Sequence, residues 1–126
     1  MSKQLYLLAV AAALACTSEP ALAQLVPVEW DAAGRFSKDI PVPAGKFVEV
    51  CEKLPKGARV LWSFDAAAAL SFNIHYHEGK DVRFPARKDQ ATQESGTLAA
   101  ELDQDYCWMW TNKTSAAVTL KLQLQR

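Results

Sequence analysis

The sequence predicts an all-β protein, an antiparallel β-sandwich or jelly-roll-like fold of about seven or eight strands. Short segments in which apolar and polar residues alternate follow one another along most of the chain. Turn-forming residues separate these segments at positions 43–45, 55–57, 78–80 and 112–115. The alternation is clearest near the C-terminus, where Val118, Leu120, Leu122 and Leu124 fall on one face of a strand and polar residues fall on the other.

These turns set the limits of each expected strand. The turn at Gly45 separates the first two strands, the turn at Gly57 precedes the third, and the turn at Gly79 follows the fourth. The polar run ARKDQATQES, residues 86–95, is expected to be a long solvated loop between the fifth and sixth strands. The expected strands are residues 35–40, 46–52, 58–64, 70–77, 81–84, 96–102, 106–111 and 116–125.

The first 23 residues have the features of a secretory signal peptide. Lys3 precedes an apolar run at 5–15, and residues 21–23 (ALA) are small where signal peptidase reads the chain. The apolar run is shorter than the about 20 residues that span a membrane. Cleavage after Ala23 would leave 126 − 23 = 103 residues, 24–126, as one domain without membrane insertion. We expect a periplasmic protein, with a lipoprotein modified at Cys16 as the alternative.

Charge and motif content narrow the classes of function. The whole chain has 14 basic and 14 acidic residues, and loss of Lys3 and Glu19 with the signal peptide leaves 13 of each. This balance does not favour binding to nucleic acid or to an anionic membrane surface. The mature chain has no glycine-rich phosphate loop and no nucleophile elbow. We therefore expect that the protein is not an enzyme.

Two cysteines remain after removal of the signal peptide, Cys51 and Cys107. An even number of cysteines in an oxidising compartment favours a disulfide between them. In the chain-entropy model, a disulfide that closes a loop of this length contributes up to roughly 4 to 5 kcal/mol to the free energy of unfolding. The alternative is a pair of thiolates that serve as metal ligands.

The only two histidines, His75 and His77, lie in the segment LSFNIHYHEG. Because side chains alternate along a strand, both imidazoles should point away from the core, opposite the apolar face of Phe72, Ile74 and Tyr76. Same-face neighbours on a strand are about 7 Å apart, close enough for two imidazoles to bind one ion. A solvent-facing or partner-facing polar strand is the alternative interpretation.

The segment YCWMWT supplies the third expected ligand. If Trp108 and Trp110 pack into the core, Met109 points outward and can lie beside the histidines on a neighbouring strand. Two imidazoles with a thioether suit copper, especially Cu(I). Glu78 and Cys107 are further candidate ligands, and a carboxylate in the set would favour Cu(II) or zinc. Copper is the expected ion, with zinc second.

The chain resembles the GOLD domain, a β-sandwich of Golgi-trafficking cargo receptors and lipid-transfer proteins, over residues 46 to about 125. The pattern is a Trp-x-Phe strand, a later strand with alternating aromatics ending in Asn, and a final alternating strand. The matching residues are Trp62, Phe64, Tyr106, Trp108, Trp110 and Asn112. The resemblance implies an adaptor module that binds proteins or membranes and is not an enzyme. The His-x-His motif and Met109 are not part of the family pattern.

Two hypotheses follow from these observations. The first is a soluble periplasmic copper-binding or copper-chaperone protein with His75, His77 and Met109 as ligands. The second is a GOLD-like interaction module that binds a periplasmic protein partner and holds no metal.

Overall fold

The structure is a computed structural model that describes residues 12, 13, 15 and 24–126. The expected signal-peptide cleavage site at residues 21–23 and the alternative lipidation site at Cys16 lie outside the described residues. Within the described part of the chain, no helix is long and apolar enough to cross a membrane.

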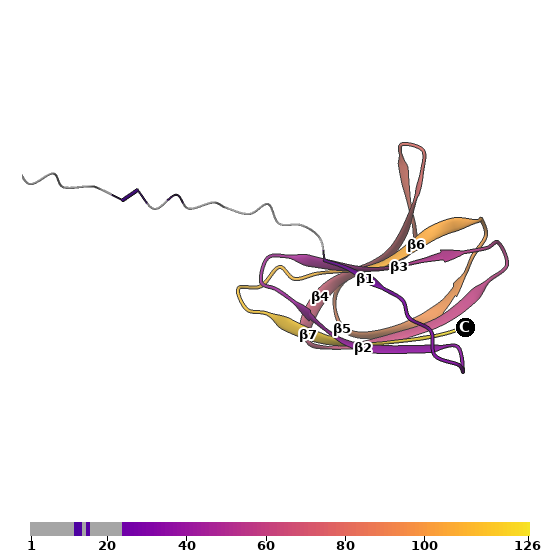
Figure 1. The fold of residues 1–126 in the computed structure, drawn as a ribbon, viewed down its shortest axis with the longest axis horizontal. Coiled ribbons are helices and arrows are strands. Elements are labelled where there is room, and N and C mark those ends of the chain that lie inside the picture. Colours follow the sequence, from indigo (N-terminus) through magenta and orange to yellow (C-terminus); the bar gives the residue numbers. More distant parts are fainter. Residues whose placement is uncertain (1–11, 14, 16–23) are drawn as a thin grey trace, which may run out of the picture.

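The described chain folds into seven β-strands, and the predicted all-β sandwich class is confirmed (Figure 1). One curled sheet has the strand order β1-β3-β6-β4-β7-β2, and β5 pairs with β4. The pairs are antiparallel except β1 with β3, which is parallel. The strands are β1 (Gln24–Pro27), β2 (Arg35–Val42), β3 (Phe47–Leu54), β4 (Arg59–Glu78), β5 (Asp81–Ala99), β6 (Gln104–Thr111) and β7 (Val118–Gln125).

Strand β4 belongs to both layers of the sandwich. Its residues 61–66 pair with β7, whereas its residues 71–75 pair with β6. We call β1, β3, β6 and the second half of β4 the disulfide layer, and β2, β7 and the first half of β4 the opposite layer. Strand β5 accompanies β4 along both halves.

Apolar side chains from the two layers meet in a single core. Trp108 and Trp110 on β6 are fully buried, as predicted from the alternation of the YCWMWT segment. The ring of Phe64, on the first half of β4, contacts Trp110 edge to face with centroids 5.6 Å apart, and Phe72 lies 4.9 Å from Phe64. These contacts join the layers through aromatic side chains.

Two expectations about β4 and β5 are wrong. The segments 58–64 and 70–77 are one strand, and the alanine run 66–69 lies within it at a register shift between Asp65 and Leu70. The polar run 86–95 is strand and not loop. Its hydrophilicity has a physical reason, because β4 is the only described strand that pairs with β5, which makes β5 an edge strand among residues 24–126. Charged residues on an edge strand discourage pairing with other chains.

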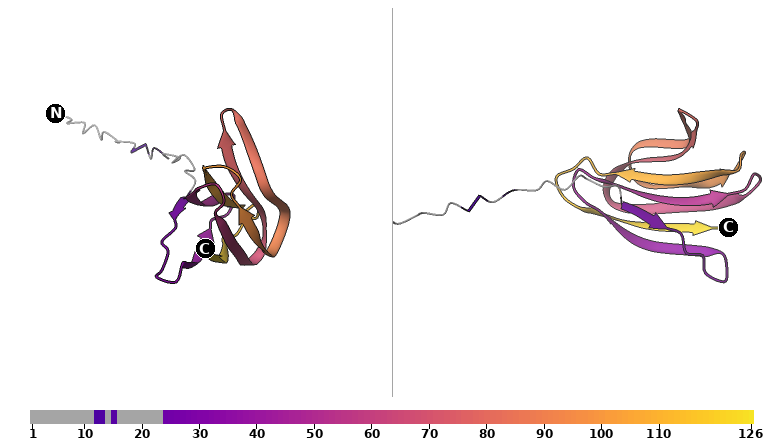
Figure 2. Two further views of the ribbon diagram at one scale, coloured as in Figure 1. Left: turned by 90° about the vertical axis from the view of Figure 1, so that its right-hand side faces the viewer. Right: turned by 45° about the horizontal axis from the view of Figure 1, so that its top comes forward.

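The β4–β5 hairpin projects beyond the neighbouring strands (Figure 1). Pairing of β4 with β6 ends at His75, but pairing with β5 continues to Glu78 and Asp81. Gly79 makes the turn with a φ of 61°, a conformation that glycine adopts at little cost. Both views in Figure 2 show the tip of this hairpin standing clear of the other strands. The expected histidine site lies at the base of this projection.

Candidate functional site

The residues singled out from the sequence, except Glu78, gather on the outward surface of the disulfide layer. We call this surface the disulfide face. Its side chains come from β3, β6, the second half of β4 and the start of β5, and strand register brings them into neighbouring rows. The disulfide face consists of Glu49, Cys51, Asn73, His75, His77, Val82, Phe84, Arg87, Cys107 and Met109.

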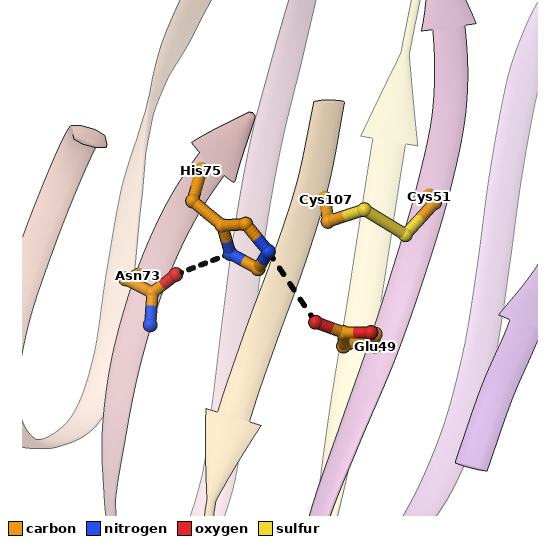
Figure 3. The surroundings of a disulfide bond; sticks show 5 residues. All are labelled: Glu49, Cys51, Asn73, His75 and Cys107. Atoms are coloured by element: carbon orange, nitrogen blue, oxygen red, sulfur yellow. Dashed lines mark hydrogen bonds and ion pairs between the residues drawn. A yellow bond between two sulfur atoms is a disulfide. The ribbon is translucent and has the colours of Figure 1, made fainter. Parts of the chain in front are cut away.

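A disulfide joins Cys51 and Cys107 at the centre of this face (Figure 3). The two residues lie directly opposite each other in the β3–β6 pair, with Cα atoms 4.1 Å apart. The predicted disulfide is thereby confirmed. A disulfide sulfur is not a thiolate, so Cys107 does not supply the metal ligand that was considered as an alternative.

His75 points outward as expected, yet only 6% of it is exposed. His75 lies opposite Cys107 in the β4–β6 pair. On the β5 side a β-bulge places two residues, Phe84 and Pro85, opposite the single residue His75. The ring centroid of Phe84 is 6.2 Å from that of His75. The imidazole therefore lies between the disulfide strand and an aromatic ring.

Both ring nitrogens of His75 have polar neighbours (Figure 3). Nδ1 is 2.8 Å from Oδ1 of Asn73, and because an amide oxygen only accepts hydrogen bonds, Nδ1 carries the proton and donates. Nε2 lies 3.4 Å from Oε1 of Glu49, which reaches across β6 from β3. In the neutral ring with this tautomer, Nε2 presents a lone pair toward the carboxylate.

Burial controls the protonation of this histidine. Loss of solvent lowers the pKa of His75 below its ordinary value of 6.5, since burial disfavours the charged ring. The carboxylate of Glu49 opposes this effect and raises the pKa, whereas His77 lowers it further. The neutral imidazole is thus the favoured form at neutral pH.

The structure brings His77 close to His75 and leaves Glu78 apart. The two imidazoles lie on the same side of β4 with ring centroids 5.4 Å apart and an interplanar angle of 85°. His77 is exposed. Glu78 lies at the hairpin tip, where its Oε1 is 3.6 Å from Nη2 of Arg83.

Met109 lies on the disulfide face, half-buried, in register between Glu49 on β3 and Asn73 on β4. Among residues 24–126, no three or more His, Cys, Asp or Glu side chains are already close enough to hold a metal ion. The copper site formed by His75, His77 and Met109 stays a prediction.

Sequence reasoning missed Glu49 as a partner of His75. It placed Asn73 on the same face as His75 but did not identify its hydrogen bond to the imidazole. The alternation of VEVCEK does place Glu49 on the same face as Cys51. What the alternation could not supply is the order of strands, which brings β3 within reach of β4 across β6.

The flank of the hairpin carries exposed apolar side chains next to the imidazoles. Val82, opposite His77, is 41% exposed, and Phe84 is 43% exposed. The guanidinium carbon of Arg87 lies 4.7 Å from the centre of the Phe84 ring, a cation–π arrangement. This flank extends the disulfide face toward the tip.

The outward surface of the opposite layer differs in character. Its rows contain mainly hydroxyl and amide side chains that line a shallow groove. Lys121 and Gln123 on β7 are exposed there, and Leu61 is the exposed apolar residue of this groove.

Comparison with known proteins identifies similar folds and no family. No sequence-family model matches the chain, and no curated protein matches it. PliG from Aeromonas hydrophila, a periplasmic inhibitor of g-type lysozyme, is similar in structure, with a TM-score of 0.58 and 15% sequence identity. The alignment covers 82% of this chain and 96% of PliG. PliG from Salmonella Typhimurium gives a TM-score of 0.50 at 14% identity, covering 82% and 98%.

A third similar structure is the pre-peptidase C-terminal domain of a collagenase from Bacillus anthracis. Its TM-score is 0.58 at 9% identity, and the alignment covers 86% of this chain and 100% of that domain. At these identities the similarity concerns the fold alone. None of these matches is a GOLD domain, so membership of that family stays a prediction.

Proposed function

We propose that this protein is a periplasmic, non-enzymatic binding module that recognises a protein partner through the disulfide face and the adjoining β4–β5 hairpin. The observation that carries this proposal is the exposure of Val82 and Phe84 on a projecting hairpin, next to a surface whose centre is half-buried and poor in charge. Surface patches of this kind are typical of protein–protein interfaces.

The composition of the face supports the same conclusion. Aromatic residues, Met and Arg are enriched in interface centres. On this face Arg87 lies over the ring of Phe84, and Met109 lies in the same row as Arg87, on the other side of Asn73. On the opposite layer the outward residues of β7 alternate as Thr119, Lys121, Gln123 and Gln125, all exposed and hydrophilic. The disulfide face and the adjoining hairpin thus combine two exposed apolar side chains, Val82 and Phe84, whereas the groove of the opposite layer exposes a single apolar residue, Leu61, among hydrophilic ones.

The similar folds and the expected export support a periplasmic setting. Two of the similar structures are periplasmic proteins that inhibit g-type lysozyme. The Cys51–Cys107 disulfide fits an oxidising compartment. An inhibitor-like role against a secreted hydrolase is therefore the first specific role to test, and a g-type lysozyme is the first partner. The GOLD-like adaptor hypothesis belongs to the same functional class.

The experiment combines a binding assay with crosslinking from two surfaces. Binding of the purified mature protein to a g-type lysozyme is measured by calorimetry, alongside inhibition of that enzyme. In parallel, a photo-crosslinking amino acid is placed at Val82 or, as the matched control, at Lys121 on the opposite layer, and the protein is expressed in the periplasm.

We expect a defined protein adduct from position 82 and none from position 121. Phe84→Ser should weaken binding to the crosslinked partner by about tenfold or more, as truncation of an interface anchor does. Gln123→Ser should leave it unchanged. Absence of binding to the lysozyme would exclude only g-type lysozyme as the partner. Equal crosslinking from positions 82 and 121 would refute the disulfide face as the binding surface.

A further inference from the structure

Glu49 and His75 converge on one point of the disulfide face. Nε2 of the imidazole and Oε1 of the carboxylate lie 3.4 Å apart, a distance at which a proton on Nε2 would join them as an ion pair. When the ring is neutral and Nδ1 donates to Asn73, Nε2 carries a lone pair, and the ionised carboxylate also only accepts. A metal ion can then take the place of the Nε2 proton and bind both atoms.

We propose that Glu49, His75 and His77 bind a divalent transition-metal ion on the disulfide face, with zinc as the best-matched ion. The metal site does not depend on the proposed protein-binding role, because all three ligands belong to this chain and can bind the ion without a protein partner. The proposal also revises the ligand set expected from the sequence, because a carboxylate takes the place of the Met109 thioether.

The separation of the two acceptors fits a tetrahedral metal ion. With metal–ligand bonds of about 2.0 to 2.1 Å, two ligand atoms on a tetrahedral zinc ion are about 3.3 to 3.4 Å apart. The Nε2–Oε1 distance of 3.4 Å matches that tetrahedral edge. An ion could therefore enter between Glu49 and His75 without moving either strand.

His77 is placed to supply the third ligand. Two imidazoles bound through nitrogen to one tetrahedral ion have ring centres about 5 Å apart, given bonds of about 2 Å. The observed distance between the centroids of His75 and His77 is 5.4 Å. Because His77 is exposed, its ring can rotate toward the ion without displacing a packed neighbour. Water or a partner's side chain would complete the coordination.

The surroundings of His75 resemble the support that metal-binding histidines receive. A ligating histidine usually donates its other ring N–H to an oxygen, which holds the tautomer and the ring orientation. Asn73 accepts that hydrogen bond here at 2.8 Å. Phe84 and the strand that carries Cys107 flank the ring and limit its movement. Nε2 is consequently the nitrogen that is held ready for a ligand.

The donor set distinguishes the ions. Two imidazoles and one carboxylate are borderline and hard donors, which suit zinc or Cu(II), whereas Cu(I) requires softer sulfur donors. The Cys51–Cys107 disulfide offers no thiolate. Zinc prefers the tetrahedral geometry whose edge matches the 3.4 Å separation of Nε2 and Oε1.

The test is zinc titration of the metal-free, oxidised mature protein, measured by competition with a chromogenic chelator. We expect one zinc ion per chain. Glu49→Gln, which keeps the size of the side chain, should weaken binding at least tenfold. The matched control is Glu78→Gln, because that carboxylate is next to His77 in sequence but interacts with Arg83 at the hairpin tip. This control should bind zinc like the wild type.

Two further variants test the geometry. His77→Ala should weaken binding at least tenfold, and Asn73→Leu should weaken it about 10- to 100-fold through loss of the outer hydrogen bond. Since His75 is buried, its role is read by NMR in the wild-type protein, where zinc should shift Nε2 of His75 and not Nδ1. Thermal unfolding of each variant without metal checks that the fold is retained.

Several results would overturn the proposal. One is the absence of stoichiometric zinc binding. Another is binding that Glu49→Gln leaves unchanged. A third is the pattern in which Met109→Leu abolishes metal uptake but Glu49→Gln does not, since this would restore the histidine–methionine ligand set.

Discussion

The indole of Trp62 packs directly on Gly96, its partner in the β4–β5 pair. A Cβ atom added at Gly96 would lie 2.8 Å from Cζ2 of Trp62 and 3.1 Å from Cε2. Trp62 is itself buried and contacts Phe72 with ring centroids 5.0 Å apart. The absence of a side chain at position 96 therefore allows a large core residue to cover the backbone of β5.

Replacing Gly96 with Ala should destabilise the protein by about 1 to 3 kcal/mol, because the added methyl group forces the indole out of its packed position. Urea unfolding followed by tryptophan fluorescence measures the change in free energy. Ser95→Ala is the matched control on the exposed side of the same strand and should stay within about 0.5 kcal/mol of wild type. Equal stability of G96A and S95A would contradict the close packing.

Removal of the disulfide should cost about 2 to 5 kcal/mol, as for native disulfides in small exported domains. The bond joins two residues that are 56 positions apart, so its loss frees a long loop in the unfolded chain. The double variant Cys51→Ser/Cys107→Ser is compared with the wild type by urea unfolding. The reduced wild type should unfold at nearly the same urea concentration as the double variant. A reduced protein as stable as the oxidised one would show that the bond contributes little.

Asn112→Ala should destabilise the protein by about 2 to 4 kcal/mol, at about 1 kcal/mol for each hydrogen bond lost. Asn112 is fully buried, and its Nδ2 donates to the carbonyl oxygens of Val42 and Ala116 at 3.0 and 2.8 Å. Its Oδ1 accepts from both N and Oγ1 of Thr114. Lys113→Ala, in the same turn but exposed, is the control and should be nearly neutral. Similar melting temperatures for the two variants would refute this role.

Stability of the metal-free protein should fall as the pH drops below about 6.5. The pKa of His75 is lowered in the folded state by burial, so between that pKa and 6.5 the unfolded chain binds a proton that the folded protein resists. The contribution is fully present above pH 6.5 and is lost as the pH falls through the folded pKa. Glu49, which faces His75 from β3, reduces the effect, and His77 adds to it.

The measurement is urea unfolding between pH 5.5 and 7.5 with a chelator present. His75→Gln should remove most of the pH dependence in this window, whatever its effect on overall stability, whereas His77→Gln should retain it. Equal slopes for wild type and H75Q would contradict the assignment to His75.

Alternation predicted which residues of this protein face the core, but it could not predict how far each strand extends. Phe72, Ile74, Trp108 and Trp110 are buried as their two-residue period indicates. In residues 86–95 the alternation fails, because β5 pairs along one side only and exposes most of its side chains. Polar residues suit an exposed edge as well as they suit a loop, so composition cannot separate the two.

The candidate site was predictable only in the part that lies on a single strand. The common facing of His75 and His77 follows from their spacing. The pairing of His75 with Glu49 depends on β6 lying between β3 and β4, a long-range arrangement that no local pattern encodes. The same arrangement places Met109 between Glu49 and Asn73.

Because β4 contributes hydrogen bonds to both layers, the sandwich has no independent halves. If the opposite layer opened, β7 would separate from the first half of β4, whose second half pairs with β6 in the disulfide layer. The contact between Phe64 and Trp110 would break at the same time. In hydrogen-exchange terms, we expect the central amides of β6 and β7 to show one common free energy of opening, equal to that of global unfolding. The bent strand thus makes the whole domain a single cooperative unit.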